Sequence, residues 1–210
     1  MDKKYLYGIG AGLGALFVLK LLRAYKPLSP GDAAFPKSTP YKATCSSGSR
    51  SMDKVTLIVL HSTEGDSIDG AIGTFAAADA GGSTQLVVGE TGAVRILPDD
   101  VIPCGSPGAN TQGLHVEMVG FANWSVSQWM ARQKTLACAA RNVADWCAKY
   151  GIPARLLSAA DLLAGASGIT SHANVSAAWK KSNHWDPGPS FPIEHFMSMV
   201  NTALSGGSIS

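Results

Sequence analysis

Strand-like and helix-like hydrophobic patterns alternate between residues 55 and 204 of this 210-residue chain. A continuous apolar run, VTLIVL, is typical of a buried strand, and QLVVGETGAVRIL predicts a hairpin that turns at Glu90-Thr91-Gly92. A further short strand is predicted at 114–119. Apolar residues at helical spacing predict three helices, at 67–78, at 127–150 with Ser125 or Ser127 as the cap, and at 192–204. Strands interleaved with helices indicate an α/β body.

A long uncharged stretch lies near the N-terminus, YLYGIGAGLGALFVL at residues 5–19. As a helix, residues 5–22 would rise about 27 Å, just short of the roughly 30 Å hydrocarbon core of a bilayer. Lys20 can extend its ammonium group toward the headgroups. We therefore expect residues 1–25 to form a retained N-terminal transmembrane helix.

Two other interpretations of this segment stay open. A cleaved signal peptide would explain the charged start at Lys3 and Lys4, but no small-x-small cleavage site directly follows the apolar stretch. A buried core helix is the second alternative, and the missing polar face argues against it.

Four glycines weaken the predicted membrane helix, since each costs roughly 1 kcal/mol of helix propensity relative to alanine. Gly8 and Gly12, and likewise Gly10 and Gly14, have the small-xxx-small spacing of a helix-dimer face, which predicts a homodimer through this segment. Weakly hydrophobic segments rich in Gly and Ala resemble the signal-arrest-release anchors of some phage endolysins.

Charge divides the chain into two parts. Residues 1–54 carry nine Lys/Arg and three Asp/Glu, whereas residues 55–210 carry eight Lys/Arg and twelve Asp/Glu. A mildly acidic body argues against nucleic-acid binding, which needs a basic face to displace counterions. Because residues 26–54 are rich in Pro, Ser, Gly and Lys and have no apolar periodicity, we expect a semi-extended linker before a single domain at 55–204. The last residues, 205–210, are expected to be a flexible tail.

The four cysteines do not have metal-site spacing, because no CxxC pair exists. Cys45 lies in the expected linker and Cys104 in a loop. A disulfide can form outside the cytoplasm, but the sequence identifies no pairing. Cys138 and Cys147 share a predicted helix and are expected to be small buried hydrophobic residues.

Three polar positions are not needed for packing. His61 ends a predicted buried strand, His172 follows a short apolar stretch, and Asp186 precedes Pro187. Each alone is more often a hydrogen-bonded structural residue. Together, two imidazoles and one carboxylate leave a fourth tetrahedral position open, which is the composition of a catalytic zinc site.

Several motifs in order resemble the type 2 N-acetylmuramoyl-L-alanine amidases, the family that includes peptidoglycan recognition proteins and many phage endolysins. The resemblance covers about residues 55–196 and is carried by VTLIVLHST, QLVVGETGAVRILPDD, GANTQGLHVEMVGFANWS, ACAARNVADWCAKYGIP, ITSHANVS and HWDPGPSF. It implies a central mixed β-sheet flanked by helices, with Zn²⁺ in a groove. It also implies that His61, His172 and Asp186 are the zinc ligands.

The resemblance implies roles at three further positions. Glu117 matches the strand position where many active members place a catalytic glutamate, a sensible general base beside a metal. His184 stands where the family often has lysine, and an imidazole there can still stabilise an oxyanion. Asn110 matches the family's loop asparagine and is expected to contact the muropeptide substrate. Cys104 lies in a loop where relatives commonly have an aromatic-His stretch, so substrate contacts there are expected to differ.

The activity implied is hydrolysis of the amide between the lactyl group of N-acetylmuramic acid and the L-Ala of the stem peptide. A phage lysis enzyme, anchored in the membrane with its catalytic domain on the cell-wall side, is the expected setting. A cytoplasmic recycling enzyme would need no membrane segment. The alternatives are a non-catalytic peptidoglycan-binding receptor and a membrane-anchored virion component with an amidase-like fold.

Overall fold

The computed structural model describes residues 25–39 and 42–209. The predicted membrane segment, apart from Tyr25, lies outside these residues, and so do its paired glycines. Within the described ranges, no helix has the length and apolar character that crossing a bilayer requires.

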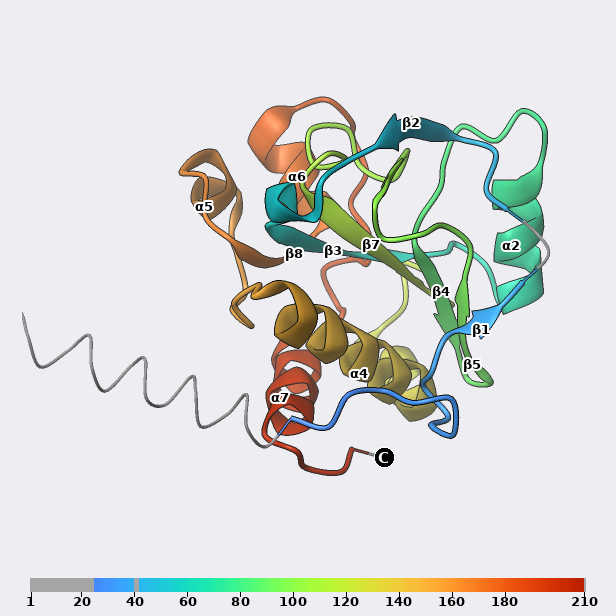
Figure 1. The fold of residues 1–210 in the computed structure, drawn as a ribbon, viewed down its shortest axis with the longest axis vertical. Helices are drawn as coiled ribbons and strands as arrows, with labels where there is room; N and C mark the ends of the chain where they lie inside the picture. The colour runs from blue at the N-terminus through green and yellow to red at the C-terminus, as the bar shows by residue number, and fades with distance from the viewer. Residues whose placement is uncertain (1–24, 40–41, 210) are drawn as a thin grey trace, which may run out of the picture.

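A six-stranded mixed sheet forms the centre of the domain, with strand order β1-β5-β4-β7-β3-β8 (Figure 1). Its neighbouring strands are parallel except for the β4–β5 hairpin, which is antiparallel. The strands are β1 (Lys37–Ser38), β3 (Leu57–Ser62), β4 (Leu86–Gly89), β5 (Gly92–Arg95), β7 (Gly113–Met118) and β8 (Gly168–Ser171). The expected α/β fold with a central mixed sheet is thereby confirmed.

Helices cover both faces of this sheet. On one face, α4 (Gln133–Tyr150) packs against α7 (Ile193–Leu204), and their apolar residues join Ile58 and Leu60 in the largest core cluster. On the other face, Leu57 and Val59 pack against residues of α5 (Ala159–Leu163) and α6 (His172–Trp179). The other helices of the described residues are α2 (Ile68–Ala76) and α3 (Val126–Met130), with a short 3₁₀ turn, η1, at Met52–Lys54.

The helix predicted at 127–150 is two helices in the structure. Ser125 caps α3 through a capping box with Gln128, and α3 ends at Met130. Arg132 leaves the helical region, with φ −104° and ψ 43°, before α4 begins at Gln133. No glycine or proline marks this break, so the apolar period alone could not reveal it.

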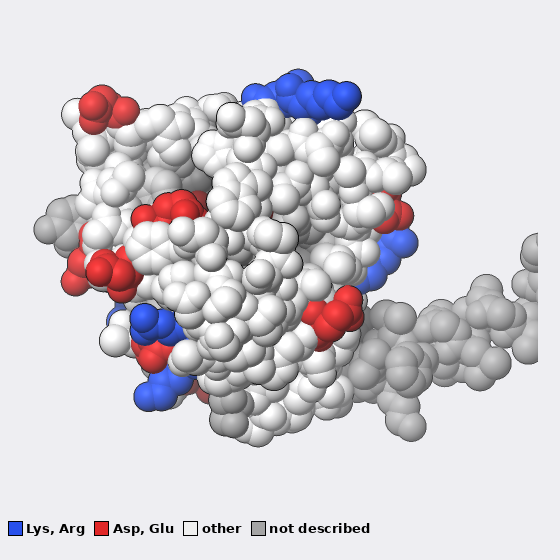
Figure 2. All heavy atoms as spheres, turned by 180° about the vertical axis from the view of Figure 1, so that it is seen from behind, with Lys and Arg blue, Asp and Glu red and all other residues white. Residues whose placement is uncertain are grey.

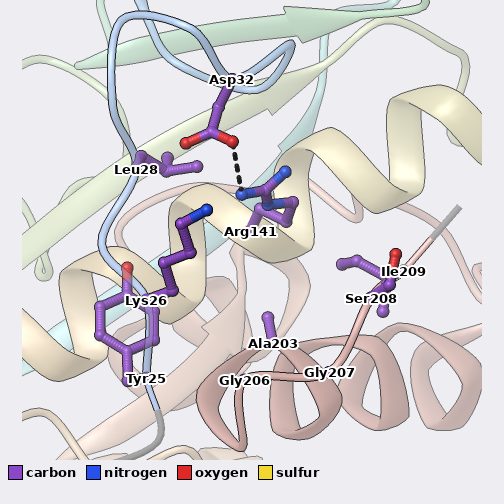
Figure 3. A pocket seen from close by; sticks show the side chains of 10 residues that line it. All are labelled: Tyr25, Lys26, Leu28, Asp32, Arg141, Ala203, Gly206, Gly207, Ser208 and Ile209. Atoms are coloured by element: carbon purple, nitrogen blue, oxygen red, sulfur yellow. Dashed lines mark ion pairs between the residues drawn. The ribbon is translucent and has the colours of Figure 1, made fainter.

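The described part of residues 26–54 packs on the domain, which differs from the semi-extended linker expected from composition. The Tyr25 hydroxyl donates a 2.7 Å hydrogen bond to Asp145 on α4. Figure 3 shows Asp32 facing Arg141 of the same helix, at 3.2 Å. β1 pairs with β5 and forms one edge of the sheet. This segment is therefore part of the folded body.

The C-terminal residues also pack on the body rather than extend as a free tail. The amide of Gly207 donates to the Thr202 carbonyl, and Ile209 contacts the core cluster. Gly206, Gly207 and Ile209 line the same pocket as Tyr25 (Figure 3). The two ends of the described chain thus lie close together over α4 and α7.

A disulfide joins Cys45 to Cys104, a pairing that the sequence did not identify. It lies beside a two-stranded antiparallel ribbon of β2 (Ser46–Ser49) and β6 (Val101–Pro103). Cys138 and Cys147 are buried free thiols, as predicted. The disulfide ties the residue just before β2 to the loop that follows β6.

Thiol titration should distinguish these two pairs of cysteines. Burial raises the pKa of both Cys138 and Cys147 to about 12, so neither should react with iodoacetamide in the native protein. Denaturation without reductant should expose two thiols, and denaturation with reductant four. Mass spectrometry of the alkylated peptides would count them. Four reactive thiols in the unreduced denatured protein would contradict the Cys45–Cys104 bond.

Charged side chains are sparse on the face of the molecule seen in Figure 2. The acidic and basic groups there are scattered and in places lie side by side, and most of the surface between them is uncharged. This face therefore carries no continuous stripe of positive or of negative side chains.

Candidate metal and catalytic site

Three neighbouring parallel strands bring the predicted site residues to one edge of the sheet. His61 lies at the end of β3, beside Glu117 of β7 in the strand register. β8 runs along the other side of β3, and His172 begins α6 directly after it. The carboxyl ends of parallel strands meet at one edge, which is where open α/β sheets bind ligands. The sheet register therefore brings together residues that are up to 111 positions apart.

Asp186 reaches this edge from the loop after α6. Its carbonyl accepts a 3.1 Å hydrogen bond from the amide of Ala173 in the first turn of α6. The peptide bond from Asp186 to Pro187 is cis. Gly188 has φ +94°, and a Cβ atom there would collide with the Ala122 carbonyl oxygen. Only glycine fits at this point, where the loop crosses close to another backbone segment.

The three predicted ligands form a compact buried cluster. The Nδ1 atoms of His61 and His172 approach separate oxygens of Asp186, at 3.0 Å and 3.1 Å. One ligand atom from each residue lies within 4.8 Å of the others. All three side chains are less than 9% exposed. Two nitrogens and one oxygen thus lie close enough together to hold one metal ion.

Electrostatics at this cluster favour a charged Asp186 and a neutral His172. Burial alone would raise the pKa of Asp186, but hydrogen bonds from His172 and His61 outweigh it and hold that pKa well below its usual range. Burial lowers the pKa of His172, although Asp186 partly opposes this. A deprotonated carboxylate and neutral imidazoles are the forms that bind metals.

The donor set fits a zinc ion. Ligand atoms around tetrahedral zinc, at about 2.0–2.1 Å from the ion, lie roughly 3.3 Å from one another. The Nδ1 atoms lie 3.0 Å and 3.1 Å from different oxygens of Asp186, and the three ligand atoms lie within 4.8 Å of one another, which is compatible with that spacing. Three protein ligands also leave the fourth position that catalytic zinc sites keep open.

Comparison with protein families finds a match to N-acetylmuramoyl-L-alanine amidase over residues 51–189, which contain the whole cluster. The chain belongs to this family. Comparison with curated proteins finds no match.

Three solved structures share the fold of this amidase at low sequence identity. The Staphylococcus aureus hydrolase AmiA, in complex with its ligand, is 17% identical over 81% of this chain and 80% of its own, with a TM-score of 0.60. PlyL is 14% identical over 82% of this chain and 99% of its own, with a TM-score of 0.58. A selenomethionine derivative of AmpD is 16% identical over 83% of this chain and 99% of its own, with a TM-score of 0.58.

Glu117 lies beside the ligand cluster of the amidase without joining it. Its Oε1 is 3.9 Å from His61 Nδ1. Its Oε2 is buried and has no hydrogen-bond partner among the described residues. Burial, followed by the charges of Asp186 and Glu64, raises the pKa of Glu117 well above its usual value. A carboxyl group with a raised pKa and one unpaired oxygen is suited to proton transfer.

His184 lies at the exposed side of the cluster. Its side chain is 63% exposed, and its Nδ1 is 3.6 Å from Asp186 Oδ1. Its ring stacks on His172, with centroids 4.4 Å apart and planes 7° apart. The structure thus places His184 and Glu117 beside the same three residues, and their catalytic roles stay predictions.

Asn110, the predicted substrate contact, is used within its own loop. Its side-chain oxygen accepts hydrogen bonds from the amides of Gly105 and Ser106, at 3.2 Å and 2.6 Å. The same loop is held by Arg50, whose guanidinium donates to the carbonyls of Asn110 and Gly113. A contact between Asn110 and substrate stays a prediction.

Two residues that sequence reasoning missed contact the ligand histidines. Ser182 Oγ lies 3.3 Å from His172 Nε2 and 2.7 Å from Ser176 Oγ. His115 Nδ1 lies 2.9 Å from His61 Nε2. His115 carried an available signal, because it is two positions before Glu117 in a strand, where side chains alternate. Ser182 carried none, since it lies in an irregular loop.

Glu64 is a third missed residue and supports the neighbouring backbone. Its Oε1 accepts hydrogen bonds from Ser62 Oγ and from the amide of Ala122, both at 2.7 Å. Ala122 is the residue against which Gly188 packs. Glu64 therefore connects the end of β3 to the segment that supports the Asp186 loop.

Proposed function

We propose that this amidase hydrolyses the amide between the lactyl group of N-acetylmuramic acid and the L-Ala of the stem peptide. The observation that carries this proposal is the buried cluster of His61, His172 and Asp186 beside a glutamate with an unpaired oxygen. A zinc ion held by these three residues supplies Lewis-acid polarisation of the scissile carbonyl and lowers the pKa of water.

Glu117 acts as the general base and then as the general acid. Its unpaired Oε2 takes a proton from the attacking water, and the same carboxyl returns the proton to the leaving amine. Its raised pKa suits both halves of this cycle, because the neutral form must be accessible after the first transfer.

His184 stabilises the oxyanion that forms on the substrate carbonyl. Its exposed ring can reach a bound substrate, while stacking on His172 holds it beside the cluster. Losing a donor of this kind typically costs about 10²–10³-fold in rate. A histidine gives shorter reach than the lysine common in the family.

Peptidoglycan hydrolysis by the full-length protein tests the proposal. With zinc present, the wild type should release new L-Ala amino termini, a chelator should stop the release, and added zinc should restore it. His61→Ala should release none. No release by the zinc-loaded wild type would support the non-catalytic receptor instead. Equal release by His61→Ala would contradict catalysis at this cluster. Full biological function in an inactive Glu117 variant would favour the structural virion component.

We also propose that residues 1–25 anchor the catalytic domain on the cell-wall side of a membrane, as in a phage lysis enzyme. The uncharged stretch at 5–19 supports the anchor. The Cys45–Cys104 disulfide supports an oxidising compartment outside the cytoplasm. Full-length protein should partition with membranes at high salt, whereas a variant without residues 1–24 should not. Recovery of both proteins in the soluble fraction would reject the anchor.

A further inference from the structure

We propose that His115 is a positioning residue: its Nδ1 accepts the hydrogen bond of His61 Nε2 and so holds His61 with Nδ1 free for the metal. The inference rests on the zinc site of the proposed function. His115 itself binds no metal. It sets the orientation and the proton position of His61, which does.

The contact between the two histidines is direct and fully buried. The nitrogen-to-nitrogen distance is 2.9 Å, and the ring planes lie 25° apart with centroids at 5.1 Å. His115 is 0% exposed and His61 is 2% exposed. Both side chains come from neighbouring parallel strands, in which Val59 and His115 are partners in the register. Water therefore does not compete for this hydrogen bond.

Proton placement follows from the one N–H that a neutral imidazole carries. His61 Nδ1 faces Asp186, so a metal bound at Nδ1 leaves the proton of His61 on Nε2. That N–H points to His115 Nδ1, which must then be the acceptor. The reverse polarity would place the proton on His61 Nδ1 and block the metal. Metal-bound histidines commonly need such a partner for their second N–H.

His61 is the one hydrogen-bond partner of good geometry that the His115 ring has among the described residues. The Nε2 of His115 is buried and has no hydrogen-bond partner of good geometry among the described residues. An unpaired buried donor is destabilising, so packing alone gives no reason to place a histidine here.

Two glycines leave the space that the His115 ring occupies. A Cβ on Gly105 would lie 2.5 Å from His115 Nδ1, and a Cβ on Gly113 would lie 2.7 Å from Nε2. Arg50 donates to the Gly113 carbonyl, and Cys104, the neighbour of Gly105, is held by the disulfide. The imidazole is thus held between two backbone segments that are themselves fixed.

Zinc affinity of full-length variants tests this role without relying on enzyme activity. In competition with a chromophoric chelator, His115→Leu should raise the apparent Kd for Zn²⁺ by about 10–100-fold, because it removes the acceptor. His115→Asn should stay close to the wild type, since its side-chain oxygen can accept from His61 Nε2. His195→Leu is the matched control, because His195 bonds to Gln133 and not to the ligand cluster. Its zinc affinity should be unchanged.

Two outcomes of the affinity measurement would overturn the inference. These are an unchanged zinc affinity in His115→Leu, or an equal loss of zinc affinity in the Leu and Asn variants. If His115→Leu does not fold, long-range ¹H–¹⁵N correlation spectra of the zinc-loaded wild type decide. Both His61 and His115 should carry their proton on Nε2, and a proton on His115 Nδ1 would refute the proposal. His61→Ala should lose zinc binding. Wild-type zinc affinity in that variant would instead contradict the metal site of the proposed function.

Discussion

Glu117→Gln should lower kcat for amide hydrolysis by about 10²–10⁴-fold while leaving zinc affinity close to that of the wild type. The amide keeps the size and burial of the side chain but cannot accept the proton of the attacking water. Glu117 lies outside the ligand cluster, at 3.9 Å from His61 Nδ1, so zinc binding should persist. Steady-state hydrolysis of a muropeptide and a chelator competition assay would measure the two quantities.

Glu64→Gln is the matched control for this prediction. Glu64 is a neighbouring glutamate, but its Oε1 is already engaged by Ser62 and Ala122. Its substitution should affect kcat far less than that of Glu117, because it holds backbone rather than transferring a proton. Comparable losses in both variants would indicate a general electrostatic effect of the two carboxylates. A kcat for Glu117→Gln within tenfold of the wild type would contradict the general-base role.

Arg50→Met should lower the free energy of unfolding by about 3 kcal/mol or more. Arg50 is 7% exposed and donates to the carbonyls of four residues, Asp99, Asn110, Thr111 and Gly113. Hydrogen bonds to a charged group contribute about 1.5–3 kcal/mol, and carbonyls left buried without a partner add a penalty. For a chain of this size, about 3 kcal/mol corresponds to a fall in Tm of roughly 6–12 °C.

Arg155→Met provides the control for Arg50. Arg155 is exposed, and its Nε donates to one carbonyl, that of Ser167. Its loss should change the free energy of unfolding by less than about 0.5 kcal/mol, as for most surface substitutions. Denaturant unfolding of the two variants would give the comparison. Equal stability of Arg50→Met and Arg155→Met would show that the carbonyls around Arg50 find other partners.

The local elements were predictable because their signals are local. The apolar run before His61 predicted a buried strand, and the structure has β3 at Leu57–Ser62. The turn at Glu90 and Thr91 and the helix after Ser67 are likewise present. Each depends on side chains a few residues apart, through alternation, helical period or a cap. The break at Arg132 has no such signal and was missed.

The docking of residues 25–39 and 42–54 could not be predicted from composition. Proline, serine and glycine remove regular apolar patterns, but they do not prevent a segment from bonding to a surface that is already folded. Tyr25, Asp32 and Cys45 each have a partner more than 50 positions away. Such pairings depend on where the sheet and α4 place the partners, which no short window of sequence contains.

The sequence by itself determined the chemistry available to this protein. It predicted two histidines and an aspartate as ligands, a glutamate on a strand beside them and an α/β body, because residue types and short periods are properties of the chain alone. The tertiary structure decided which nitrogen of His61 faces Asp186, that His115 lies behind His61, and that Cys45 pairs with Cys104. These contacts depend on strand register and close packing, which form only when distant segments come together.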